Sequence, residues 1–369
     1  MKKLYSLLIS VLLACLLVAA PQCKAPAAPQ GQEQTSADPS EDVSEEPSAE
    51  PSSEPSEEPS QEPSEEPSVE PSEEPAPVEE SIVAGHFEKD LGDGKVAKGF
   101  YYIVDMSDER LCFNAISVKP VARLTDIFTH YVDAGVKPYI LINAGYFGGT
   151  VSVSPIVHNG VMMTSGADGQ GKYDGYYLSR AAFGMTKDRQ FQSCWVYPCQ
   201  DDPYGGLYAF PEPIPNDDRT DTYVTAPPTT QTEGAVRWDV EEAIGAGPML
   251  LKDGEDVSIE SYHKEVHAIG GRAGYNRHPR SAIGATADNK VIFLVVDGRG
   301  AGGSAGATIP EMAVYMKELG AEHAINLDGG GSAGMVGPEG TFVDTPSELP
   351  GRRVASVFMI TDKDVKRNY

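Results

Sequence analysis

Apolar residues recur along the chain in short runs that are separated by glycine-rich and polar turns. Runs of this length, bounded by turn signals, predict buried strands at 139–142, 249–251, 291–296 and 324–327. Two further runs, at 100–105 and 111–118, predict strands that pair as an early hairpin across 106–110. Helical spacing of apolar residues predicts helices at 125–133, ending at Gly135, and at 308–319.

The second helix has clear end signals. Thr308 fits the N-cap, Pro310 the first turn and Glu311 the capping-box position, and Gly320 fits the C-cap. With the runs on either side, it makes 291–328 a strand–helix–strand unit of parallel crossover length. The patterns together predict an α/β to α+β fold, with a mixed twisted sheet, flanking helices, this crossover and long surface loops.

The two strands of this crossover unit end alike. Asp297-Gly298 follows the first and Asp328-Gly329 follows the second. In a right-handed crossover these ends lie at one edge of the sheet, where ligands bind in such folds. Glycines 329–331 can turn their amides into a concave anion site. The alternative is a tight turn between strands with a capping aspartate.

Two stretches rich in glycine, proline and polar residues, 164–178 and 198–235, are predicted loops. A loop as long as the second is usually functional or mobile. We prefer to interpret it as exposed decoration. The alternative is that it overhangs a cleft, where Tyr204, Tyr208 and Tyr223 would stack on a sugar ring.

The N-terminal part of the chain differs from the rest. Residues 1–23 resemble an export signal, with a basic start and an uncharged apolar run, and Cys15 or Cys23 is a candidate for lipidation. A retained N-terminal anchor is the alternative. Residues 24–82 contain a Glu-Pro-Ser-x repeat, which predicts an extended acidic spacer without a core. One folded domain is expected at 83–369, with its motifs at 100–360.

The net charge of −26 mostly reflects this spacer, because 18 acidic residues and no Lys or Arg lie between Glu33 and Glu80. The rest of the chain has a net charge of −8 and contains no cluster of basic residues, which argues against nucleic-acid binding. The folded part has three cysteines. Cys194 and Cys199 are close enough in sequence to pair, which leaves Cys112 alone, and no Cys/His spacing resembles a zinc site.

Six motifs then occur in the order found in the phosphodiester glycosidase family, and a seventh segment resembles that family's Arg-Pro-Val-Ala. They are Asn143-Ala144-Gly145-Tyr146-Phe147, Gly245-Ala246-Gly247-Pro248, Arg277-His278-Pro279-Arg280-Ser281-Ala282-Ile283-Gly284, Asp297-Gly298-Arg299, Ala307-Thr308 with Glu311, Asn326-Leu327-Asp328-Gly329-Gly330-Gly331-Ser332 and Arg352-Arg353-Val354-Ala355. The chain departs at Ala144 and Tyr146, where Gly and Phe are usual, and at Arg353, which replaces the proline. The resemblance spans about 100–360.

The resemblance implies cleavage of a sugar-1-phosphodiester at the glycosidic bond, with release of the sugar and a phosphomonoester. Phosphate is already a good leaving group, so the site needs charge stabilisation more than a general acid. Asp328 and Asp297 are candidates for nucleophile or base, and Glu311 is a third. The residues expected to bind substrate are Asn143, Arg280, Arg299, Thr308, Asn326, Gly329, Gly330, Gly331, Ser332 and Arg352. Of these, the arginines 280 and 352 and the amides of 329–332 would hold phosphate, and the two asparagines would bind sugar hydroxyls.

Several of these residues have structural alternatives. Glu311 can serve only the helix cap, Asp297 only the turn before Gly298, and Arg299 only an ion pair with Asp297. His278 is expected to be a packed histidine. A divalent cation on Asp297 and Asp328 is conceivable, although no cofactor is required by the sequence.

Three functions fit these observations. The first is an exported enzyme that is anchored to the membrane by a lipid, is displayed on a stalk at the cell envelope, and acts on a carbohydrate phosphodiester. The second is a glycan-binding module without activity, and the third is a transferase in exopolysaccharide assembly. The presence of every motif carboxylate favours the enzyme.

Overall fold

The computed structural model describes residues 78–166, 172–173, 175–267, 274–366 and 369. The predicted export signal and almost all of the predicted spacer lie outside these residues. Strands dominate the described part, and every strand pairing found there is antiparallel. The expected combination of strands and helices is present, but the mixed sheet is not, because strands that run in the same direction are not neighbours.

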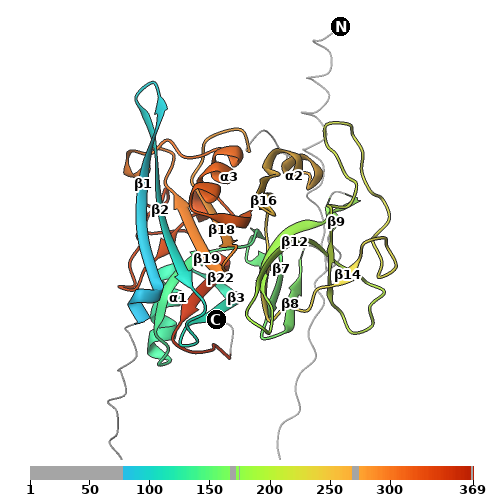
Figure 1. Ribbon diagram of the computed structural model, residues 1–369, viewed down its shortest axis with the longest axis horizontal. Helices are drawn as coiled ribbons and strands as arrows, with labels where there is room; N and C mark the ends of the chain where they lie inside the picture. Colours follow the sequence, from blue (N-terminus) through green and yellow to red (C-terminus); the bar gives the residue numbers. More distant parts are fainter. Residues whose placement is uncertain (1–77, 167–171, 174, 268–273, 367–368) are drawn as a thin grey trace, which may run out of the picture. The chain divides into compact units, whose positions relative to one another are not determined.

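The first seven-stranded sheet has the strand order β1-β2-β19-β18-β20-β16-β17 (Figure 1). Its middle strand β18 is antiparallel to both β19 and β20, so these two run in the same direction with one strand between them. Helix α3 connects them and packs against β16, β18 and β20. The strands are β1 (Ile82–Gly92), β2 (Lys95–Asp105), β16 (Met249–Lys252), β17 (Glu255–Asp256), β18 (Arg280–Thr286), β19 (Lys290–Val296) and β20 (Ala321–Asn326).

A second seven-stranded sheet has the order β14-β13-β12-β11-β15-β7-β8, and a four-stranded sheet has the order β21-β4-β22-β3. The second sheet contains β7 (Pro155–His158), β8 (Val161–Ser165), β11 (Arg180–Met185), β12 (Phe191–Pro198), β13 (Leu207–Phe210), β14 (Val236–Arg237) and β15 (Glu242–Gly245). The four-stranded sheet contains β3 (Cys112–Ala122), β4 (Pro138–Asn143), β21 (Met335–Val336) and β22 (Val354–Thr361). Two small ribbons pair β5 (Phe147–Gly148) with β6 (Val151–Ser152), and β9 (Lys172–Tyr173) with β10 (Tyr176–Tyr177).

The α-helices of the described residues are α1 (Leu124–Asp133), α2 (Ser258–Lys264) and α3 (Ile309–Glu318). Single 3₁₀ turns occur at Val78–Ser81, Ala301–Gly303 and Gly330–Ser332. The first and third helices were predicted, and the capping box of Thr308 and Glu311 is confirmed. Gly320 adopts φ +92° directly after the C-cap residue Leu319. Within the described part of the chain, no helix is both long and apolar enough to span a membrane.

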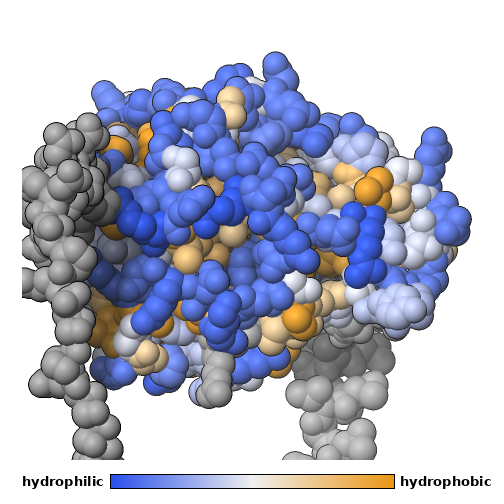
Figure 2. Space-filling model, turned by 60° about the horizontal axis from the view of Figure 1, so that its bottom comes forward, coloured by the Kyte–Doolittle hydropathy of each residue, from blue (hydrophilic) through white to orange (hydrophobic). Residues whose placement is uncertain are grey.

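One hydrophobic core joins the three large sheets, because buried side chains from all of them pack in a single cluster. Phe113, Phe183 and Phe358 meet at its centre, with ring centroids 5.3 to 6.2 Å apart. Figure 2 shows one face of the folded part as largely hydrophilic, with hydrophobic residues in small separate patches. The three sheets therefore fold as one domain around a shared interior.

Two sequence predictions about pairing are wrong. The strands at 100–105 and 111–118 exist, but β2 pairs with β1 and β19 while β3 pairs with β22, so they form no hairpin. Cys194 and Cys199 do not pair, and both are free thiols like Cys112. The predicted loop at 198–235 includes the strand β13, and part of it supports the candidate site described next.

Candidate active site

Strand register brings the motif segments to one edge of the first sheet. Arg280, the first residue of β18, lies opposite Val296, the last residue of β19. Ala282 lies opposite Asn326, the last residue of β20. The beginning of β18 and the ends of β19 and β20 therefore share one edge, as the Asp-Gly pattern predicted.

A cavity of about 320 Å³ opens at this edge, a volume within the usual range for small-molecule sites. We call it the Asp328 cavity. It is lined by Tyr146, Pro248, Tyr262, His267, Gly274, His278, Arg280, Arg299, Ile309, Asn326, Asp328, Gly329 and Gly330. Six of the thirteen sequence-predicted site residues are among them: Arg280, Arg299, Asn326, Asp328, Gly329 and Gly330.

Asp328 is the carboxylate of this cavity. Burial raises its pKa to about 6, although a hydrogen bond from the Ser332 hydroxyl, the charge of Arg352 and the Gly329 amide favour the ionised form. The group therefore changes its charge close to neutral pH. A carboxylate with this property can serve as a base or nucleophile.

The backbone at Asp328 is fixed by Asn143, the last residue of β4. The Asn143 side-chain amide donates to the Asp328 carbonyl at 2.6 Å, and its oxygen accepts from the Ser281 hydroxyl at 2.6 Å and the Gly334 amide at 3.1 Å. The Asp328 amide donates to the Ala144 carbonyl at 2.8 Å. Asn143 is fully buried, so it has no surface for the predicted contact with sugar hydroxyls. It holds three segments together beneath the cavity.

Two arginines give the cavity positive charge. Arg280 is 8% exposed, and its guanidinium donates to the carbonyls of Ala307 and Asn276, both at 3.1 Å. Burial and the charge of Arg299 lower the pKa of Arg280. Arg299 is exposed at the cavity edge and makes no ion pair with Asp297 within the described residues, so the predicted alternative of a purely local pair is wrong. Both guanidinium groups can face an anion.

Two histidines line the cavity in their neutral form. Burial lowers the pKa of His278, and the nearby charges of Arg280 and Arg299 lower it further. Burial and the charge of Arg180 lower the pKa of His267. The charge of the cavity near neutral pH is therefore carried by the arginines and Asp328.

Asn326 offers an unused acceptor at the cavity. Its side-chain amide donates to the carbonyls of Gly247 at 3.0 Å and Leu327 at 2.7 Å. Its side-chain oxygen is buried and has no hydrogen-bond partner in the described part of the chain. A sugar hydroxyl that donates to this oxygen would satisfy it.

Gly247 directly precedes Pro248, which lines the cavity. The Tyr146 hydroxyl donates to the Gly247 carbonyl at 2.5 Å. The φ of this glycine is +118°, and a Cβ there would lie 2.4 Å from the Glu265 carboxylate and 2.9 Å from the His267 ring. Only glycine allows the chain to approach these side chains so closely.

The glycine loop after Asp328 uses most of its amides internally. The Gly330 amide donates to the Pro279 carbonyl at 2.8 Å, the Ser332 amide donates to the Gly329 carbonyl at 3.2 Å, and the Gly329 amide bonds to the Asp328 carboxylate. These three groups are not aimed outward, as an anion nest would require. The loop therefore orients Asp328 rather than presenting a row of donors.

Ser332 and Arg352 lie behind Asp328. Arg352 donates to the Ser332 hydroxyl at 3.4 Å and pairs with Glu348. Neither residue lines the cavity, and Gly331 does not line it either. Arg352 therefore acts on Asp328 through charge and through the serine.

Asp297 occupies a different environment from Asp328. It is 2% exposed and does not line the cavity. One carboxylate oxygen accepts from the Thr345 amide at 2.9 Å, and the other is buried with no hydrogen-bond partner among the described residues. Burial raises its pKa. The predicted convergence of two carboxylates on one cleft is therefore not observed.

Glu311 and Thr308 also lie outside the lining of the cavity. The Thr308 amide donates to the Glu311 carboxylate at 2.8 Å, and the Glu311 amide donates to the Thr308 hydroxyl at 3.3 Å. Glu311 also pairs with Arg277. Both residues serve the beginning of α3.

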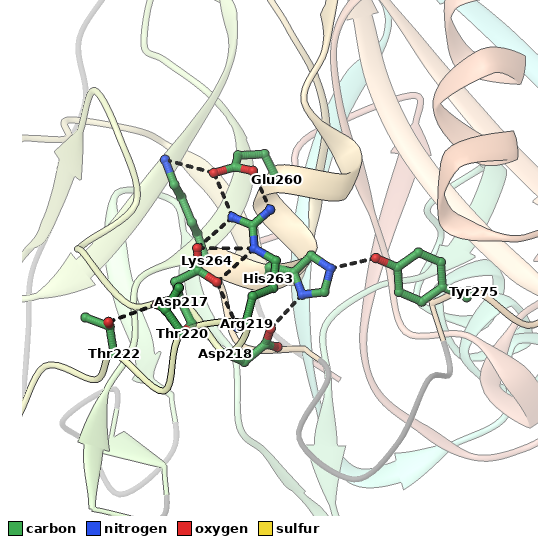
Figure 3. A network of polar contacts seen from close by, with 9 residues as sticks. All are labelled: Asp217, Asp218, Arg219, Thr220, Thr222, Glu260, His263, Lys264 and Tyr275. Carbon is green, nitrogen blue, oxygen red and sulfur yellow. Dashed lines mark hydrogen bonds and ion pairs between the residues drawn. The ribbon is translucent and has the colours of Figure 1, made fainter.

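The wall formed by α2 is supported from the loop that carried no recognisable motif. His263 bonds through one ring nitrogen to Asp218 and through the other to the Tyr275 hydroxyl, both at 2.6 Å (Figure 3). Arg219 pairs with Asp217 and with Glu260 of α2 at 2.6 and 2.9 Å. These contacts tie residues 217–222 to the helix that places Tyr262 in the cavity.

Sequence reasoning assigned no role to Tyr146, Tyr262 and His267, although all three line the cavity. Tyr146 lies within the first motif and could have been found there. Tyr262 and His267 lie outside every recognised motif, and only the fold shows that they line the same cavity as Asp328. Among the described residues, no group of three or more His, Cys, Asp or Glu side chains could hold a metal ion.

Residues 213–361 match the family model described as phosphodiester glycosidase, which confirms the resemblance. No curated protein matches the chain.

The folds of several solved structures are similar. One is the catalytic domain of zebrafish N-acetylglucosamine-1-phosphodiester alpha-N-acetylglucosaminidase, auto-inhibited by its pro-peptide. It has a TM-score of 0.52 and 20% identity, over 78% of this chain and 84% of that one. A hypothetical protein from Synechocystis has a TM-score of 0.48 and 18% identity, over 76% of this chain and 62% of that one. A protein from Burkholderia pseudomallei has a TM-score of 0.49 and 16% identity, over 72% and 74%.

Proposed function

We propose that the chain is a hydrolase that cleaves a sugar-1-phosphodiester, of the N-acetylglucosamine-1-phosphodiester type, between the anomeric carbon and the phosphate. The observation that carries this proposal is the placement of one carboxylate, Asp328, in the same cavity as Arg280 and Arg299. The family match and the fold similarity support it.

Four of the cavity residues then have a part in the reaction. Arg280 and Arg299 bind the phosphodiester and stabilise the charge that develops on it as the glycosidic bond breaks. Asp328, ionised above about pH 6, acts toward the anomeric carbon as nucleophile or as the base that takes a proton from water. The bond electrons leave with the phosphate, which departs as a phosphomonoester. Water supplies the new hydroxyl of the sugar, either directly or by breaking the bond that the anomeric carbon has formed to Asp328. The Asn326 oxygen accepts a hydrogen bond from a sugar hydroxyl.

The cellular setting of this activity is also part of the proposal. Residues 1–23 direct export and provide a lipid anchor, and residues 24–82 form an acidic stalk that carries the domain away from the membrane at the cell envelope. The composition of both segments supports this arrangement.

The test replaces Asp328 with asparagine, which keeps the shape of the side chain and removes its charge. With the methyl phosphodiester of N-acetylglucosamine 1-phosphate as substrate, kcat should fall by about 10² or more. Asp133→Asn, at the exposed end of α1, is the matched control and should leave kcat unchanged. Proton and phosphorus NMR would identify the free sugar and methyl phosphate as products.

The pH profile gives a second readout. Because the ionised carboxylate is required, kcat should rise with pH and reach half of its plateau near pH 6. If the wild-type chain cleaves none of a panel of sugar-1-phosphodiesters and Asp328→Asn binds them as the wild type does, the hydrolase proposal fails and a binding module remains.

A further inference from the structure

A second cavity, of about 540 Å³, lies on the second seven-stranded sheet. It is formed between the turn from β7 to β8 and the turn from β12 to β13, and it shares no lining residue with the Asp328 cavity. We call it the Tyr204 cavity. Its volume is in the range of ligand sites rather than of packing defects.

The ring of Tyr204 is displayed at this cavity. It is 88% exposed, more than any other large hydrophobic side chain of the described residues. Its backbone is nevertheless fixed, because its amide donates to the Asp202 carboxylate at 3.0 Å and the next amide, that of Gly205, donates to the Asp202 carbonyl at 3.1 Å. An aromatic ring held in water on an anchored turn provides a flat apolar surface with a polar tip.

A charged pair lies beside the ring. The Asp202 carboxylate, which is almost fully buried, accepts from Arg237 at 2.8 Å and from the Tyr208 hydroxyl at 3.2 Å. Arg237 also pairs with Asp239 at 3.2 Å, and 46% of its side chain stays exposed at the cavity. A Cβ at Gly206 would lie 2.9 Å from the carboxylate and 3.3 Å from the guanidinium carbon, so glycine leaves room for the pair.

The chemistry of this cavity differs from that of the first. Two arginines face one carboxylate in the Asp328 cavity, which suits an anion, whereas the charges of Arg237 and Asp202 balance in the Tyr204 cavity. An open aromatic face beside fixed hydrogen-bonding groups suits a ring with one apolar face and several hydroxyls. A single exposed aromatic residue is normal on a protein surface, but here the ring, the anchored turn, the polar pair and the cavity coincide.

We propose that the Tyr204 cavity is a second carbohydrate site, in which a neutral pyranose unit of a glycan chain stacks on Tyr204 and hydrogen-bonds to Arg237. The site would hold the glycan while the Asp328 cavity acts elsewhere on the same molecule. Binding at the Tyr204 cavity stands on its own residues and does not depend on the hydrolase proposal.

The test is isothermal titration calorimetry of the full-length chain with three neutral tetrasaccharides: cellotetraose, maltotetraose and tetra-N-acetylchitotetraose. At least one should bind saturably. Tyr204→Ala should weaken that binding about tenfold or more, the scale of a lost aromatic contact. Tyr204→Phe keeps the ring and is the matched control, so it should bind nearly as well as the wild type. Because the side chain is exposed, thermal unfolding should be the same in all three proteins.

Asp328→Asn separates the two cavities. It should bind the same tetrasaccharide with unchanged affinity, even where it abolishes hydrolysis of a sugar-1-phosphodiester. The inference is overturned if no tetrasaccharide binds the wild type, if Tyr204→Ala binds as the wild type does, or if Asp328→Asn loses the binding. Loss of hydrolysis alone leaves the carbohydrate site standing.

Discussion

Replacing Asp344 with asparagine should stabilise the fold at alkaline pH and reduce its dependence on pH. Asp344 is 9% exposed, and one of its carboxylate oxygens accepts from the Met335 amide at 2.9 Å. Burial, together with the nearby charge of Asp297, raises the pKa of Asp344 to about 7. An asparagine can accept the same hydrogen bond without carrying the charge.

The magnitude follows from linkage. The pKa of Asp344 is about 7 in the folded chain and 3.8 as the ordinary value. Between these values the folded chain holds a proton that the unfolded chain releases, so the free energy of unfolding falls as pH rises. The difference between the two pKa values corresponds to a loss of roughly 4 kcal/mol in the free energy of unfolding. This loss is complete above pH 7, where Asp344 is ionised in the folded state as well.

Chemical denaturation at pH 4 and pH 8, with linear extrapolation to water, measures this effect. Asp344→Asn should be more stable than the wild type at pH 8, by up to about 4 kcal/mol, and close to it at pH 4. Asp133→Asn, whose side chain is exposed, should show the pH dependence of the wild type. An Asp344→Asn protein that is no more stable than the wild type at pH 8 would refute the reasoning.

Two further substitutions test the roles of predicted site residues. Asn143→Ala removes a buried side chain that bonds to Asp328, Ser281 and Gly334, so it should lower the free energy of unfolding by about 1–3 kcal/mol or more, measured by urea denaturation. Glu311→Gln keeps the oxygen that caps α3 but loses the charge, so kcat on the sugar-1-phosphodiester should not change; a large fall would return Glu311 to the catalytic candidates.

The sequence was most informative where local chemistry decides the structure. The capping box at Thr308 and the apolar runs of β4, β16, β19 and β20 correspond to observed elements. Sheet pairing was less accessible, because the register of a strand depends on partners that are distant in sequence. β2 and β3 are consecutive, yet each pairs within a different sheet, and the run between them could equally have closed a hairpin.

The candidate site illustrates the same limit. Asp297 and Asp328 both follow a buried strand and precede a glycine, and the sequence treats them alike. Asp297 is the first residue after β19, whereas Asp328 is the second residue after β20. Because side chains alternate between the faces of a strand, Asp328 is directed into the cavity and Asp297 toward Thr345. The degree to which each carboxylate is buried follows from the packing of the whole domain.

Asp297 and Asp328 therefore have different roles, although both stand in an Asp-Gly pair after a strand. Asp328 lies in the cavity that Arg280 and Arg299 also line, and these two arginines can bind an anion there. Asp297 is buried outside the cavity, and its charge disfavours ionisation of the buried Asp344. Asp344 therefore contributes to the pH response of the fold, whereas the carboxylate of the Asp328 cavity determines the pH response of the chemistry. Measuring both profiles on one protein would show whether stability falls between about pH 4 and pH 7, the interval between the unfolded and folded pKa values of Asp344, while activity rises to half of its plateau near pH 6.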